Sequence, residues 1–458
     1  MTTLPEPVQS PVELVASPAD TASGGSGVQR WLSQTSGPIF SAYCIAAAFG
    51  TYFCMYGFRK PFTAASFEEF SWLGVQFKTV LITSQVAGYT LSKFIGIKVV
   101  SEIRPAWRAP GVLALIGIAE LALLCFAITP PPYNMLFLFL NGLPLGIVFG
   151  LVLSFLEGRR FTEALSAGLC ASFIVSSGVV KSIGKSLVQQ YQVSEFWMPF
   201  LVGLMFVPPL LLCVWMLRQI PAPTAEDVAL RSARQPMNKQ LRWSLFWRHR
   251  WGLSGLVAIY VLLTIGRSIR DDFGVEIWQD LGYEKTPSVY ARSETWVMFG
   301  VVFINGLAIC IRSNRNAFLG ALVLLVAGFA TVIASLTLYS YDLVSPFVFM
   351  VLLGLGTYVP YVAFHTTVFE RFIAAFREPG NIGYLMYLAD ATGYLAYVMG
   401  IVLRKLATGH IEYLQLLNRV SITMAIGSIA IASGLLITYY RKVPRTPPPA
   451  ETLPEKGF

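Results

Sequence analysis

The sequence predicts an all-α integral membrane protein with twelve transmembrane helices arranged as two six-helix halves. The first observation is composition: 55% of the 458 residues are hydrophobic and 13% are charged, whereas a soluble chain is about one quarter charged. The second is that apolar blocks recur along the chain, each near the roughly 20 residues that a membrane-crossing helix needs. The third is a basic connection that separates the first six blocks from the last six. An ordinary soluble enzyme and a secreted domain are excluded.

The apolar blocks define the elements in order along the chain. The longest connection, 218–250, is a basic linker predicted to be cytoplasmic, between an N-terminal half at 38–217 and a C-terminal half at 251–440. The predicted spans are 38–58, 76–97, 111–129, 134–156, 165–188, 196–217, 251–268, 293–311, 317–339, 344–368, 381–403 and 415–440.

Polar segments lie at both ends of the chain. Residues 1–37 are rich in Pro, Ser, Thr and Gly and have no signal-peptide pattern, so we expect a disordered cytoplasmic tail. Residues 441–458 form a second short tail. The connections 130–133, 189–195 and 340–345 contain no Lys or Arg and are expected to face outward. This bias predicts a multi-pass protein of the cell (inner) membrane with both termini in the cytoplasm.

The net charge of +9 is dispersed between the apolar blocks and accompanies no nucleic-acid motif, so no nucleic-acid partner is expected. Six cysteines lie inside apolar segments without a CxxC pair or metal-ligand spacing. We therefore predict no metal and no cofactor. The expected partners are the lipid bilayer and a small anionic substrate, and the expected state is a monomer.

Polar landmarks repeat between the halves. Arg59 ends the first span and Arg267 ends the seventh, 208 positions later, while Lys181 and Asp390 are 209 positions apart. Similar offsets indicate a parallel repeat of six helices, the arrangement of transporters whose halves enclose a central binding site.

Charged residues inside the spans carry the functional prediction. Each charge near the bilayer centre costs about 2.5–3.5 kcal/mol, so these side chains face water, a partner or a ligand. The interpretation counts one intramembrane carboxylate, Asp390, against five cations. That excess favours an anion, and arginine binds phosphate bidentately. The cations are Arg59, Lys93, Lys181, Lys185 and Arg267.

Helical spacing groups further residues with these charges. Tyr89 and Lys93 are four residues apart and share a helix face, and Tyr56 precedes Arg59 by one turn. We expect both tyrosines to donate hydrogen bonds to the anion. Lys181 and Lys185 are spaced in the same way.

Structural roles remain open for the lysines and for Asp390. Lys93 and Lys181 also fit a structural pair with Asp390 or a backbone carbonyl, and Lys185 fits a position in water near the outer surface. Asp390 is expected either to pair with Lys181 while the site is empty or to carry a proton.

Arg59 and Arg267 lie near span ends and also fit cations that extend to the membrane interface. His365 is a candidate for coupling or gating, and it equally fits a hydrogen-bonded helix histidine. These alternatives need a structure to separate them.

Three segments resemble a known family. Tyr56-Gly57-Phe58-Arg59-Lys60-Pro61-Phe62 is similar to the Tyr-x-x-Arg-Lys-Asn-Phe segment of the organophosphate:phosphate antiporters of the major facilitator superfamily, with Pro61 in place of Asn. Tyr89-Thr90-Leu91-Ser92-Lys93-Phe94-Ile95 is similar to their Tyr-x-x-Ser-Lys-Phe-Ile. Arg267 with Asp272 and Phe273 matches their helix-seven pattern. The resemblance implies that Arg59 and Arg267 bind substrate phosphate from opposite halves, supported by Lys93.

The sequence also departs from that family. The helix-five histidine has no counterpart, and Ser176, Ser177, Lys181 and Lys185 occupy its region. Asp390 is not part of the family pattern. The exchange mechanism and the substrate specificity therefore stay open.

The expected function is secondary active transport of a small anionic, phosphorylated metabolite by alternating access. The alternatives are a proton-coupled symporter of another organic anion or sugar, and a transporter-like anion sensor. An enzyme is not expected, because no nucleophile motif is present and the three histidines, His249, His365 and His410, are far apart in sequence.

Overall fold

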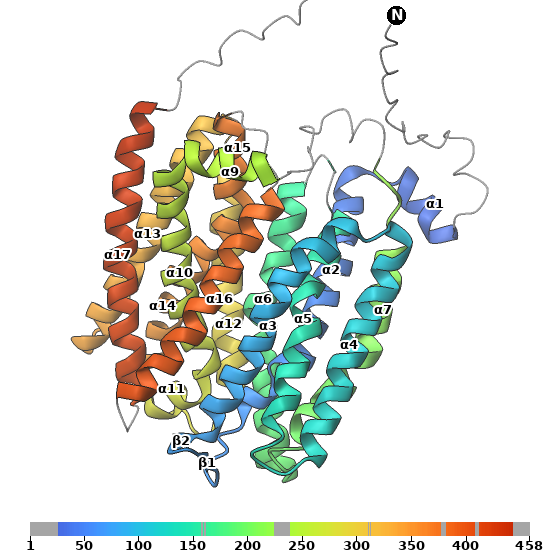
Figure 1. Ribbon diagram of the computed structural model, residues 1–458, viewed down its shortest axis with the longest axis vertical. Coiled ribbons are helices and arrows are strands. Elements are labelled where there is room, and N and C mark those ends of the chain that lie inside the picture. The colour runs from blue at the N-terminus through green and yellow to red at the C-terminus, as the bar shows by residue number, and fades with distance from the viewer. Residues whose placement is uncertain are drawn as a thin grey trace, which may run out of the picture.

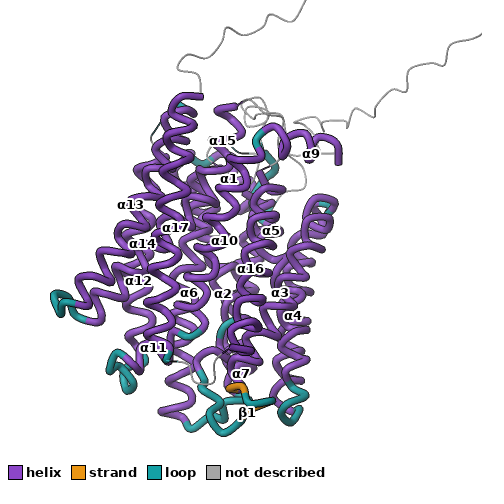
Figure 2. Tube along the Cα trace, turned by 60° about the vertical axis from the view of Figure 1, so that its left-hand side comes forward, coloured by secondary structure: helices purple, strands orange, loops and turns teal. Residues whose placement is uncertain are grey.

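The computed structural model describes residues 26–156, 159, 162–223, 239–309, 311, 313–376, 382–407 and 412–442. Long helices run side by side through the height of the molecule, and a small two-stranded hairpin lies at one end (Figures 1 and 2). We call this the hairpin end. The opposite end, where α1 and α9 lie, is the α1 end.

The N-terminal half contains six long helices. Between the first two, the chain forms the 3₁₀ turn η1 (Pro61–Ala64) and the antiparallel strands β1 (Ser71–Trp72) and β2 (Val75–Gln76). Gly74 in the tight turn between the strands has a φ of 72°, a conformation that glycine adopts without strain. The helices are α2 (Gly37–Arg59), α3 (Phe77–Glu102), α4 (Pro105–Ile128), α5 (Met135–Leu156), α6 (Thr162–Tyr191) and α7 (Met198–Arg218).

The C-terminal half follows a short helix, α9 (Lys239–Arg248). A second short helix, α11 (Gly274–Asp280), directly follows α10 at the hairpin end. The tenth predicted span is not a uniform helix, because α14 (Pro346–Ala363) continues through the π-helical turn η2 (Phe364–Val368) into α15 (Phe369–Phe376). The other helices are α10 (Arg250–Asp272), α12 (Ser288–Ile309), α13 (Asn314–Ser340), α16 (Ile382–Ala407) and α17 (Tyr413–Lys442).

All twelve predicted spans fall on long helices, but only ten helices of the described residues are long and apolar enough to cross a membrane. The other two predicted spans coincide with α3 and α12, which contain charged residues such as Lys93 and Glu294. These two helices pack across the boundary between the halves, α3 against α16 and α12 against α6. Their polarity follows from that position, because residues that face the other half need not be apolar.

The boundary between α6 and α12 is a close one. A Cβ atom on Gly178 of α6 would lie 2.5 Å from the carbonyl oxygen of Tyr290 in α12. The absence of a side chain at Gly178 therefore lets the two backbones approach each other.

The predicted N-terminal tail is wrong in one part. Gly27–Gln34 form the helix α1, capped by the Ser26 hydroxyl, which accepts a hydrogen bond from the Gln29 amide (3.2 Å), and Leu32 is buried. Residues 1–25 and 443–458 lie outside the described residues. In the basic linker, α9 occupies Lys239–Arg248.

The described ends of the chain, α1 and the last turn of α17, lie at the same end of the bundle (Figure 1). The prediction that this end faces the cytoplasm stays a prediction.

Candidate functional site

Arg59 and Arg267 come together from opposite halves. Arg59 is the last residue of α2 and Arg267 lies near the end of α10, and each is only 4% exposed. Both guanidinium groups lie beside the ring of Tyr394 in α16, with Cζ-to-centroid distances of 5.8 Å and 6.0 Å. The two arginines therefore lie beside the same ring, one from each half, and their binding of a substrate stays a prediction.

Aromatic rings surround the two guanidinium groups. Arg59 lies 3.8 Å from the ring centroid of Tyr89 and 5.7 Å from that of Tyr56. Arg267 lies 4.5 Å from that of Tyr361, and its Nη2 donates a hydrogen bond to the Tyr394 hydroxyl (2.9 Å). These cation–π contacts stabilise a buried positive charge without neutralising it.

Neither arginine has a carboxylate partner among the described residues. The Nε atoms of both are buried without a hydrogen-bond acceptor. A buried guanidinium is normally paired, since an unpaired buried charge is costly. Two such groups beside one tyrosine ring leave two buried Nε donors unused and two guanidinium charges without an ion-pair partner in the described part of the chain.

Several other buried cations of the described residues are paired. Lys93 contacts Asp390 (2.9 Å) and Arg270 contacts Glu294 (2.8 Å). At the hairpin end, Lys78 contacts Glu276 of α11. These contacts separate structural cations from the two arginines.

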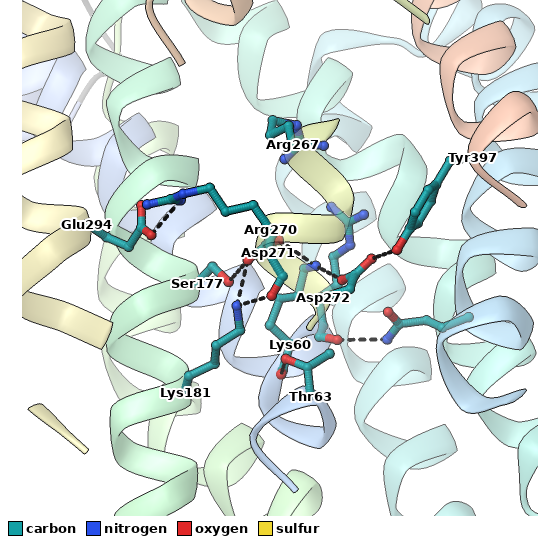
Figure 3. Close-up of polar contacts among 12 residues, drawn as sticks. Lys60, Thr63, Ser177, Lys181, Arg267, Arg270, Asp271, Asp272, Glu294 and Tyr397 are labelled. Atoms are coloured by element: carbon teal, nitrogen blue, oxygen red, sulfur yellow. Dashed lines mark hydrogen bonds and ion pairs between the residues drawn. The ribbon is translucent and has the colours of Figure 1, made fainter. Parts of the chain in front are cut away.

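Asp271 and Asp272 at the end of α10 form the densest ionic cluster (Figure 3). Lys60 contacts Asp271 (2.6 Å) and also Asp272, and Lys181 contacts Asp271 (2.7 Å). The Ser177 hydroxyl donates to Asp271 as well. The lysines and the serine belong to the N-terminal half, so the cluster joins the two halves.

The expected pairing of Asp390 with Lys181 is wrong in this structure. Asp390 contacts Lys93 and accepts a hydrogen bond from the Tyr260 hydroxyl, while Lys181 is held by Asp271. The reason is position along the bundle: Lys181 lies beside the end of α10. The structural alternative for Lys93, an ion pair with Asp390, is the one that the structure has.

His365 lies in the π-helical turn η2 and contacts the Tyr361 carbonyl through Nδ1 (2.9 Å). Its ring also packs against Phe149 and Phe173 of the N-terminal half, at centroid distances of 6.0 Å and 5.8 Å. The structure thus gives His365 the hydrogen-bonded role. Its coupling role stays a prediction.

Lys185 is buried, and no ion pair of the described residues includes it. It lies one turn beyond Lys181 on α6, and is not brought to the arginine pair by any described contact. The sequence-based count of one intramembrane carboxylate was too low. Asp271, Asp272 and Glu294 lie within α10 and α12, and Glu120 lies within α4.

The chain matches the model of one protein family over residues 61–442. This is DUF5690, a family of unknown function. The chain belongs to this family. A comparison with curated proteins finds no match.

Among solved structures, this DUF5690 chain is similar to the crystal structure of a D-xylose-proton symporter. The TM-score is 0.54 at 13% identity, over 89% of this chain and 98% of that chain. The match shows a fold like that of the major facilitator superfamily. Neither comparison supports the narrower resemblance to organophosphate:phosphate antiporters.

Several site residues of this DUF5690 chain were missed as functional from sequence. From sequence alone, Tyr394 and Asp271 have no assigned role, and Asp272 is named only in the segment that resembles helix seven of the antiporters. The one signal that could have identified Lys60 is its place directly after Arg59 in the chain. Glu294 could not be identified from the sequence, because Arg270 is 24 residues away in the chain and only folding brings the two side chains together (2.8 Å).

Proposed function

We propose that this DUF5690 protein is a secondary transporter that moves a small organic anion across the membrane by alternating access. One observation carries the proposal. Arg59 and Arg267, one from each half, are buried beside Tyr394 without a carboxylate partner in the described part of the chain. An anion that bound between them would neutralise both charges.

The arrangement favours an anion with several oxygen atoms. A guanidinium group forms two parallel hydrogen bonds with a phosphate or a carboxylate. The Tyr394 hydroxyl accepts from Arg267, so its own hydrogen is available to a third oxygen. A phosphate monoester matches these donors best, because it offers more acceptor oxygens and more charge than a monocarboxylate.

Binding from both halves connects the anion to the transport cycle. In folds with two six-helix halves, the halves move against each other around a central site. An anion held by Arg59 on one side and Arg267 on the other favours the closed arrangement of the two halves. Its release allows the halves to separate.

A thermal-shift screen of the purified protein tests the ligand class first. The screen compares phosphate monoesters, inorganic phosphate, dicarboxylates and neutral sugars, including xylose. We expect phosphate monoesters to raise the melting temperature and neutral sugars to leave it unchanged. A shift with sugars alone would contradict an anion site.

Uptake into proteoliposomes then tests transport. The ligand found by the screen is supplied in radiolabelled form, with and without the same ligand inside the vesicles. Stabilisation without uptake in either condition would indicate an anion sensor instead of a transporter. Arg292→Lys is the matched control for arginine variants, since Arg292 is exposed on α12.

A further inference from the structure

A second charge-bearing group, on a half-buried residue, lies away from the arginine pair. Glu120 is on α4, and both of its carboxyl oxygens are buried without a hydrogen-bond partner among the described residues. It lies eight residues before the end of α4 at Ile128, about 12 Å along the helix axis. This places the carboxyl group inside the apolar part of the bundle.

The facing helix leaves room for this carboxyl group. A Cβ atom on Gly203 of α7 would lie 2.0 Å from Oε2 and 2.8 Å from Oε1 of Glu120. Alanine at this position would therefore displace the carboxyl group. Gly203 therefore leaves room for the Glu120 carboxyl group at the contact between α4 and α7, and no described residue of α7 forms a hydrogen bond with that group.

No cation of the described residues forms an ion pair with Glu120. Helix α4 packs against α2, α5 and α7, and α5 has no titratable residue. No described hydrogen bond or ion pair joins Glu120 to any titratable residue of these helices. Those residues are Arg108 and Cys125 on α4, Tyr43, Cys44, Tyr52, Cys54, Tyr56 and Arg59 on α2, and Cys213 and Arg218 on α7.

An ionised carboxylate in this place would lose its hydration without compensation. A carboxyl group that carries a proton avoids that loss. Intramembrane carboxyl groups without a fixed partner are typical of proton pathways.

A chain of hydrogen bonds connects the Glu120 backbone with Arg59. The Asn141 side-chain amide donates to the Ala119 carbonyl, in the peptide group that leads to Glu120, and to the Phe58 carbonyl, in the peptide group that leads to Arg59 (both 3.0 Å). Gln85 donates to Asn141 Oδ1 (2.8 Å) and to the Arg59 carbonyl (2.7 Å). The peptide groups before and after Arg59 are thus connected by hydrogen bonds, through Asn141 and Gln85, to α4, the helix that carries Glu120.

We propose that Glu120 is a proton-binding site and that its proton occupancy controls the position of Arg59 through Asn141 and Gln85. Loss of the proton creates a charge that must reach water, which moves α4 relative to α7. Asn141 and Gln85 transmit that movement to the end of α2. The effect on transport rests on the proposed anion function, whereas proton binding does not.

Labelling with dicyclohexylcarbodiimide tests proton binding. A protonated carboxyl group adds across one C=N bond of this reagent, and the O-acylisourea rearranges to a stable N-acylurea with no leaving group. We expect mass spectrometry to find the adduct on Glu120 at about pH 6, with at least fivefold less at about pH 9. The exposed Glu68 and Glu69 are the internal controls and should not retain the label.

Two variants test whether the site is built as described. Glu120→Gln should remove the adduct, and Gly203→Ala should reduce it several-fold because the methyl group displaces the carboxyl. Absence of a Glu120 adduct in the wild-type protein would overturn the proposal. Labelling that is equal at both pH values would do the same.

Uptake measurements test the connection to Arg59. We expect an inward proton gradient to stimulate wild-type anion uptake severalfold and to have no such effect on Glu120→Gln. Gln85→Met should keep the Glu120 label and lose the stimulation. Equal stimulation of wild type and Glu120→Gln would refute the coupling.

Arg59→Lys separates the two proposals. This variant should raise the ligand concentration that half-saturates uptake and should keep the pH-dependent label on Glu120. A failure of the anion proposal would leave all labelling results standing.

Discussion

The two halves of the molecule both consist of long helices, but their ion pairs across the boundary take opposite charges from each half. Every described ion pair across the boundary takes its cation from the N-terminal half and its carboxylate from the C-terminal half. The lysines are Lys60, Lys78, Lys93 and Lys181, and the carboxylates are Asp271, Asp272, Glu276 and Asp390. In these pairs the two halves thus present electrostatically complementary surfaces to each other.

The arginine pair breaks this complementarity. Arg59 and Arg267 bring the same charge from both halves to one place, beside Tyr394. The contrast teaches that the boundary has two kinds of charge: pairs that join the halves, and a like-charged pair that we propose binds an anion. The following predictions test this division.

Removing one carboxylate of the cross-half cluster should have the largest effect. Asp271→Asn leaves Lys60 and Lys181 with less compensation, and breaking a buried pair on one side costs about 3–5 kcal/mol. We expect a lower melting temperature. In this background, a cysteine introduced near the hairpin end, for example by Lys185→Cys, should react faster with a water-soluble maleimide than the same cysteine in a protein that keeps Asp271.

Glu294→Gln is the control for this variant. It breaks the buried pair with Arg270, which lies entirely within the C-terminal half. It should lower the melting temperature without a change in maleimide reactivity. Equal reactivity in both variants would mean that the Asp271 cluster does not hold the halves together.

The Lys93–Asp390 pair tests whether a cross-half contact is structural or binds ligand. Lys93→Met alone should destabilise by about 3–5 kcal/mol, because Asp390 is left buried without its cation. The double variant Lys93→Met/Asp390→Leu should recover most of that loss. A double variant that is stable and still transports would assign the pair to structure, whereas stability without transport would assign Lys93 to substrate binding.

Conservative replacement of either arginine should weaken the anion site. Arg59→Lys and Arg267→Lys each remove the bidentate contact, worth about 2 kcal/mol for a charged hydrogen bond, or roughly 30-fold in affinity. The measurement is the ligand concentration that half-saturates the thermal shift and the uptake. Wild-type values in both variants would refute the clamp.

Tyr394→Phe should have the smallest effect. It removes the hydroxyl that accepts from Arg267 and keeps the ring, so we expect a loss of about 1 kcal/mol, or roughly fivefold in affinity. Tyr397→Phe is the control, because its hydroxyl donates to Asp272 (2.8 Å) in the cross-half cluster instead. Tyr397→Phe should alter stability more than affinity.

Sequence reasoning predicted the helices well, because a span of about 20 apolar residues is a local property of the chain. It was less accurate where a helix faces the other half, as in α3 and α12, since polarity there reflects a partner that is distant in sequence. The same cause hid the partners of charges. The cost of buried charge identified Arg59, Lys93 and Arg267, but neighbours in space decided that Lys93 is paired and the arginines are not.

Local patterns also miss irregular backbone. The π-helical turn at Phe364–Val368 interrupts what the apolar pattern presents as one span, and it carries His365. A π-helical turn differs from the α-helix around it in its hydrogen-bond spacing, and the apolar composition of the segment gives no sign of that difference. The helix at Gly27–Gln34 was missed because serine and glycine dominate its surroundings.

The one-sided placement of the lysines has a consequence for biosynthesis. The N-terminal half leaves the ribosome first, and its boundary then carries Lys60, Lys93 and Lys181 without the acids that later neutralise them. Two such surfaces from separate chains repel each other, so premature association between nascent copies is disfavoured. The C-terminal half, which is synthesised later, brings the carboxylates that pair with these lysines. The separation of cations and carboxylates between the halves therefore favours docking within one chain.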